Sequence, residues 1–127
     1  CLSDIGEGSL YHCMIWMGPR GVATPLHNDP LDNLYFHMIG HDKTFLLFPP
    51  LESEYYYAGT QERQPNVSPI DPTTKISKLK YPLFHQHVPE PQKAVLQPGD
   101  ILYIPQQWWH HVTTNDTPSI SVNIWWR

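Results

Sequence analysis

Fourteen prolines and seven glycines divide the 127 residues into short runs, most of them rich in aromatic and β-branched side chains. Proline disrupts helix interiors and cannot donate a hydrogen bond to a central strand, so such frequent prolines leave room only for short elements. Aromatic and β-branched side chains favour strands over helices. We therefore expect an all-β domain, with strands at 11–17, 33–39, 44–48, 94–96, 101–104, 112–114 and 120–126.

The length of the chain suits one domain, so residues 1–127 are treated as a single unit. Residues 49–92 are rich in Pro, Ser, Thr, Tyr and Glu with little periodicity, which predicts a long irregular insertion with a helical turn near 51–57. Long loops in small domains are usually functional, so we expect this one to border the substrate groove. The chain begins with Cys1, and we expect it to lack N-terminal elements of the full domain.

The charge balance excludes some classes of partner. A net charge of −4 offers no basic surface for a phosphate backbone, so nucleic-acid binding by this segment is disfavoured. No apolar run approaches the roughly 18 residues that a membrane span needs. The two cysteines, Cys1 and Cys13, imply no disulfide framework, and we expect an intracellular protein, cytoplasmic or nuclear.

One candidate metal-binding pair lies in the stretch PLHNDPLDN. In an extended segment, residues two apart point to the same face, so His27 and Asp29 would present an imidazole and a carboxylate side by side. Two polar residues in a proline-flanked turn would give the same pattern. A third ligand is needed to decide between these readings.

The stretch PGDILYIPQQWWHHV offers that ligand. Pro98-Gly99-Asp100 predicts a tight turn before a buried strand, and the two histidines at 110 and 111 begin the next strand, one facing inward and one outward. Two histidines and one carboxylate form the facial triad of non-haem Fe(II) oxygenases. A histidine simply packed beside two tryptophans is the alternative.

A lysine also stands in an apolar context, at the head of KTFLLFPP. Lysine is rarely buried without an anion, so an inward-pointing Lys43 would need a carboxylate guest. A solvated lysine at a strand end is the alternative.

Four motifs in this order, TPLHNDPLDN, GHDKTFLLFPP, PGDILYIPQQWWHHV and VNIWW, resemble the JmjC domains of Fe(II)- and 2-oxoglutarate-dependent oxygenases. The resemblance runs from Tyr11 to Trp126. It is closest to the small hydroxylase branch that includes the asparaginyl hydroxylase inhibiting hypoxia-inducible factor. It implies a double-stranded β-helix, a cupin-like jelly roll.

The resemblance assigns roles residue by residue. His27, Asp29 and His110 match the iron ligands, which leaves His111 as the outward neighbour. Lys43 and Thr24 match residues that hold the far carboxylate of 2-oxoglutarate. The remaining matches lie near iron or co-substrate or line the pocket: Asn33, Asn123, Tyr35, Trp16, Val112 and Trp125.

The activity implied is hydroxylation of a C–H bond with Fe(II), 2-oxoglutarate and O2, releasing succinate and CO2. A protein or peptide side chain is the expected substrate, and a homodimer through flanking segments is the expected assembly. The same chemistry on a transfer RNA nucleoside, lysine demethylation, and a non-catalytic metal-binding cupin module are the alternatives.

The sequence departs from the family pattern in two places. GHDK has one residue more between glycine and lysine than the commonest form, so Lys43 needs a small bulge to point inward. A tyrosine that many relatives use to bind 2-oxoglutarate lies upstream of where this chain begins.

Overall fold

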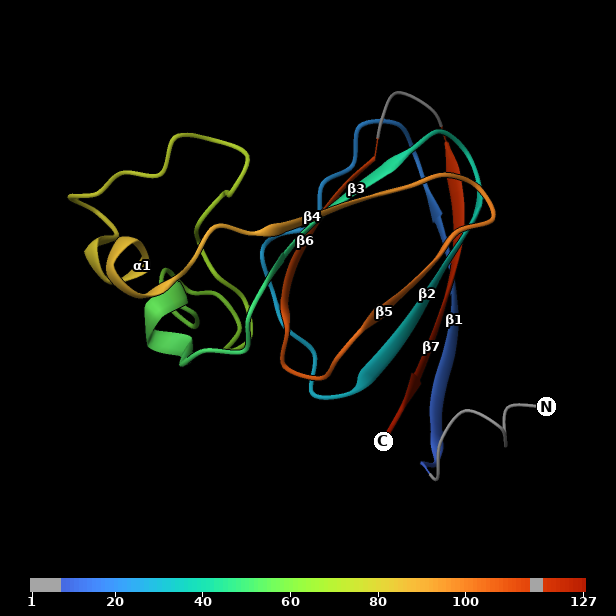
Figure 1. Cartoon of the computed structure of the whole chain (residues 1–127), viewed down its shortest axis with the longest axis horizontal. Coiled ribbons are helices and arrows are strands. Elements are labelled where there is room, and N and C mark those ends of the chain that lie inside the picture. The colour runs from blue at the N-terminus through green and yellow to red at the C-terminus, as the bar shows by residue number, and fades with distance from the viewer. Residues whose placement is uncertain (1–7, 115–117) are drawn as a thin grey trace.

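In the computed structural model, which describes residues 8–114 and 118–127, two antiparallel sheets face each other (Figure 1). The larger sheet has the order β1 (Leu10–Gly18), β7 (Ser119–Trp126), β2 (Asp32–Ile39), β5 (Ile101–Ile104). The smaller sheet has the order β4 (Gln92–Leu96), β3 (Lys43–Phe48), β6 (Trp109–Thr114). The predicted all-β jelly-roll fold is confirmed, and each described strand overlaps a predicted one.

Alternating burial along the strands explains why the sheets face each other. On β2, Asn33, Tyr35 and His37 are buried, whereas the residues between them are only partly covered. A period of two places these three side chains on the inner face of the sheet. Apolar side chains from both sheets form the core between them: Tyr35, Phe45, Leu47, Leu96, Ile104 and Val112.

The segment between β3 and β4 forms a lobe beside the sheets (Figure 1). It contains a 3-10 turn, η2 (Ser53–Tyr56), at the predicted helical turn, and the helix α1 (Pro82–His87), which was not predicted. Its core is a second apolar cluster: Leu26, Phe48, Tyr56, Ile70, Tyr81, Phe84 and Trp109. None of the helices in the described part of the chain has the length and apolar character that a membrane crossing requires.

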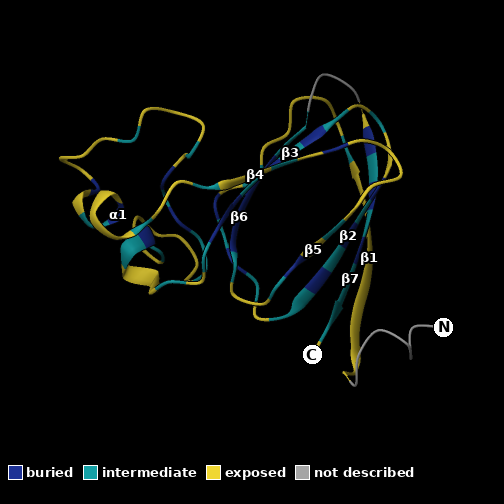
Figure 2. Cartoon of the chain, viewed as in Figure 1, coloured by how far each residue is buried: buried dark blue, intermediate teal, exposed yellow. Residues whose placement is uncertain are grey.

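Among the described strands, β1 pairs with β7 alone, and it is exposed along almost its whole length (Figure 2). Cys13 lies on this strand as a free, exposed thiol. Cys1 lies outside the described residues.

The connection from β2 to β3 absorbs the extra residue of GHDK. The pairing of β2 with β7 shifts register between His37 and Ile39, and Gly40 follows with a φ of +121°. Lys43 then enters β3 in regular register, opposite Leu96 and Thr114. The irregularity therefore lies in β2 and its turn, and Lys43 itself needs no bulge.

Replacing Gly40 by alanine is expected to destabilise the fold. A Cβ at this position would lie 2.9 Å from the Cβ of Ser119, and the backbone has a positive φ that suits only glycine. We expect the free energy of unfolding to fall by about 1–3 kcal/mol, measured by urea denaturation. Gly21→Ala is the control, because Gly21 has a φ of +65° and open space around it. An equal loss in both variants would contradict the close contact with β7.

Candidate metal centre and adjoining cavity

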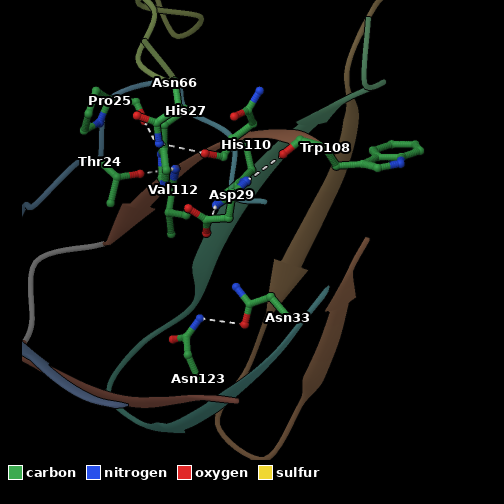
Figure 3. A network of polar contacts seen from close by, with 11 residues as sticks. Thr24, Pro25, His27, Asp29, Asn33, Asn66, Trp108, His110, Val112 and Asn123 are labelled. Carbon is green, nitrogen blue, oxygen red and sulfur yellow. Dashed lines mark hydrogen bonds and ion pairs between the residues drawn. The ribbon is translucent and has the colours of Figure 1, made fainter. Parts of the chain in front are cut away.

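Three side chains converge at one end of the space between the sheets (Figure 3). His27, Asp29 and His110 each offer a ligand atom, and these atoms lie within 4.8 Å of one another. Nε2 of His110 lies 3.8 Å from Oδ2 of Asp29, and the two imidazole centroids are 4.2 Å apart. This donor set and spacing suit one divalent metal ion, with room for further ligands.

The histidine rings are already oriented for a metal ion. Nδ1 of His27 donates to the carbonyl of Pro25 at 2.8 Å, and Nδ1 of His110 donates to the carbonyl of Trp108 at 3.0 Å. A carbonyl only accepts, so these bonds place the proton on Nδ1 and leave Nε2 free as a ligand. Burial, and secondarily the charge of His27, lower the pKa of His110 to about 4, which keeps this ring neutral.

Backbone pairing brings the distant ligands together. The segment before β2 runs antiparallel to β6, and His27 and His110 exchange both backbone hydrogen bonds, at 3.1 and 2.8 Å. The amide of Thr24 donates to the carbonyl of Val112 at 2.9 Å, and the hydroxyl oxygen of Thr24 accepts a bond from the Val112 amide at 3.0 Å. The fold therefore places Thr24 beside the histidines, with its hydroxyl proton free to donate.

A buried lysine lies in the same space. Lys43 is 6% exposed, and its Nζ donates to the hydroxyls of Tyr35 at 2.6 Å and Ser121 at 2.9 Å. No carboxylate of the described residues forms an ion pair with it. Burial lowers the pKa of Lys43, because the charged amine has lost water and gained only neutral partners. An anionic ligand bound beside Lys43 would give the amine the charged partner that it lacks among the described residues.

A cavity of about 320 Å³ joins the lysine to the metal ligands. Every residue that the sequence placed in the site lines it: Trp16, Thr24, His27, Asp29, Asn33, Tyr35, Lys43, His110, Val112, Asn123 and Trp125. Asn123 donates to the side-chain oxygen of Asn33 at 2.8 Å, while its own side-chain oxygen is buried without a partner (Figure 3). That oxygen is a free acceptor within the cavity.

The long insertion packs into the second apolar cluster. No residue between Pro49 and Pro91 is among those that line the cavity in the described chain. The insertion packs on the opposite side of β6, as Tyr56 shows by stacking on Trp109 with centroids 4.4 Å apart. Its apolar residues form this second core, so the insertion contributes nothing to the described lining of the cavity. That it borders a substrate groove stays a prediction.

Two further histidines lie near the site without lining the cavity. His111 is buried like His110 but belongs to the opposite face of β6, where the charge of Asp71 acts on it. His37 is fully buried, and its Nε2 bonds to the carbonyl of His41 at 2.8 Å.

Ser121 is the contact that sequence reasoning missed. It is fully buried and accepts hydrogen bonds from both Lys43 and the Tyr35 hydroxyl, the latter at 2.7 Å. Ser121 lies two residues before Asn123 on β7, so the period of two of a strand places both on one face, and this signal could have found Ser121.

A jelly roll with a His-Asp-His cluster inside it defines a cupin-like metal-binding domain, and comparison with known proteins agrees. The cupin-like domain family matches residues 3–127. The chain is 36% identical over 117 residues to Jumonji C domain-containing protein 5 of Drosophila melanogaster, covering 88% of this chain and 27% of that protein. It is 33% identical over 129 residues to Lysine-specific demethylase JMJ30 of Arabidopsis thaliana, covering 99% and 29%. The chain therefore belongs to the cupin-like domain family, among its JmjC-domain members.

A solved structure shows the same fold. The X-ray structure of E. coli ycfD superposes with a TM-score of 0.59 at 19% identity, covering 93% of this chain and 26% of that one. The chain thus spans less than a third of the length of each of these relatives.

Lys43→Met is expected to stabilise the protein in the absence of ligands. The substitution removes a buried charge and leaves Tyr35 and Ser121 bonded to each other, so the free energy of unfolding should rise by about 1 kcal/mol at neutral pH. In the wild type, the unfolded state binds more protons because the folded pKa of Lys43 lies below its ordinary 10.5. The advantage of the variant should therefore shrink as the pH rises toward that value.

The measurement is urea denaturation of both proteins at several pH values. Lys93→Met on β4 is the control, because Lys93 is exposed and should show neither effect. A large loss of stability in Lys43→Met would show that the amine stabilises the fold, and would contradict its role as a binding site for an anionic ligand.

Proposed function

We propose that this chain is the catalytic domain of an Fe(II)- and 2-oxoglutarate-dependent oxygenase that hydroxylates a C–H bond. The observation that carries the proposal is a single cavity with a two-histidine, one-carboxylate cluster at one end and a buried lysine without a carboxylate partner among the described residues at the other. The family supports it, because JmjC members use Fe(II) and 2-oxoglutarate.

The described residues fit both groups. His27, Asp29 and His110 would hold the iron, since their ligand atoms converge and both Nε2 atoms are unprotonated. Lys43 would pair with the far carboxylate of 2-oxoglutarate, with Thr24 and Tyr35 supplying hydroxyls from the cavity wall and Ser121 holding the amine from behind. When bound, iron and 2-oxoglutarate supply the oxidising chemistry that activates O2 and releases succinate and CO2.

The protein's own contribution is positioning. The Nδ1 bonds to the carbonyls of Pro25 and Trp108 fix the two histidine rings before any ligand arrives. Apolar residues such as Phe45, Ile104 and Val112 line the rest of the cavity and exclude water. Asn123 offers its unpaired side-chain oxygen to a donor on the substrate.

A protein side chain is the substrate we propose, and lysine demethylation is the second candidate. The name of JMJ30 and that of Lysine-specific demethylase 8 of Xenopus tropicalis, 34% identical over 131 residues, favour the demethylase. Both reactions hydroxylate a C–H bond, and a hydroxylated N-methyl group then leaves as formaldehyde. The products therefore separate the two candidates.

Three properties stay predictions from the sequence. These are an intracellular location, a homodimer through flanking segments, and a single domain over residues 1–127.

The test is turnover by the purified protein with Fe(II), 2-oxoglutarate and O2, with a library of peptides and methylated peptides as candidate substrates. NMR should show 2-oxoglutarate converted to succinate, and mass spectrometry should show a peptide that gains one oxygen atom. Loss of a methyl group with release of formaldehyde would favour the demethylase instead.

Asp29→Ala should abolish succinate formation, whereas Glu90→Ala removes an exposed carboxylate remote from the cavity and should leave it unchanged. A folded protein that binds Fe(II) yet forms no succinate would contradict the oxygenase and favour a non-catalytic metal-binding cupin module.

A further inference from the structure

The lobe formed by residues 49–91 contacts residues 26–29, the ligand segment that carries His27 and Asp29. It does so from the side opposite the cavity. Leu26 and Trp109 immediately precede the ligands His27 and His110, and both are fully buried in the apolar cluster of the lobe. Neighbouring residues of an extended chain point to opposite faces, so the anchor and the ligand of each pair point in opposite directions. The lobe thus holds the residues that lie next to two of the three ligands.

The lobe also pairs with the ligand segment through the backbone. The amide of Ser68 donates to the carbonyl of Leu26 at 2.8 Å, and the amide of Asn28 donates to the carbonyl of Asn66 at 3.1 Å. Val67 forms a bridge with His27, which is itself bridged to His110 on its other side. The ligand segment is therefore the middle member of three paired segments.

One side chain completes this pairing. Nδ2 of Asn66 donates to the carbonyl of Asn28 at 2.9 Å, and Asn28 is the buried residue between the ligands His27 and Asp29. The carbonyl of Asp29 accepts from the amide of Gln107 at 2.7 Å. The carbonyls of Asn28 and Asp29 are thus both bonded, and the bond from the Asn66 side chain is the one that a substitution can remove.

We propose that Asn66 is a positioning residue for the metal centre: its amide fixes the backbone between His27 and Asp29 and so sets the affinity and geometry of the bound metal. This inference rests on the proposed function and adds a role for the long insertion, which lines no part of the cavity in the described chain. If the backbone between His27 and Asp29 were less ordered, part of the free energy of metal binding would be lost in ordering it.

The test is titration of the metal-free protein with Co(II) without oxygen, following the visible absorption bands that report coordination geometry. Asn66→Asp keeps the size of the side chain but removes the donor, and Asn66→Ala removes the side chain. Both should weaken Co(II) binding by about tenfold and alter the bands. Thr60→Ala is the matched control, because the Thr60 hydroxyl donates to the carbonyl of Tyr57 within the same lobe and Thr60 does not line the cavity.

Thermal unfolding of the metal-free variants separates positioning from folding. Weaker binding and altered bands in a folded Asn66→Asp, with Thr60→Ala unchanged, support the proposal. Wild-type affinity and bands in both Asn66 variants overturn it while leaving the proposed function intact, and so does equal weakening in Thr60→Ala. A wild type that binds no Co(II) would overturn the proposed function, and this inference with it.

Discussion

The backbone bridge between His27 and His110 is the interaction on which the site depends. It joins the segment before β2 to β6, and these lie far apart in the sequence. Without it, the two imidazoles would have no fixed relation, and Asp29, two residues beyond His27, would lose its place beside them. The same pairing continues through Thr24 and Val112 and brings a hydroxyl into the cavity.

The two faces of β6 receive different partners. One face carries His110 and Val112 into the cavity, and the other carries Trp109 and His111 beneath the lobe. This double coverage explains why its first four residues are all buried, whereas β1, with one neighbour, is exposed. The lobe thus buries the strand that supplies a metal ligand, and its contacts reach the ligand segment from outside the cavity.

Much of this arrangement could be predicted from the sequence. Clusters of aromatic and β-branched residues between glycines and prolines located the strands. The resemblance to JmjC domains selected Asn33, Tyr35 and Asn123, and the structure places all three in the cavity. Spacing alone could not locate the lobe, because its packing depends on contacts such as Tyr56 with Trp109 that join remote segments. The acceptors for the histidine rings are backbone carbonyls, which carry no sequence signal.

We infer that the cavity binds a metal ion and a dicarboxylate together. Calorimetric titration of the Mn(II)-loaded protein with 2-oxoglutarate tests this, with wild type, Lys43→Met and Lys93→Met compared. We expect binding to the wild type and to Lys93→Met, with affinity reduced about 10- to 100-fold in Lys43→Met by loss of a charge-assisted bond. Equal affinity in all three proteins would contradict it, because the buried lysine would then have no part in binding the dicarboxylate.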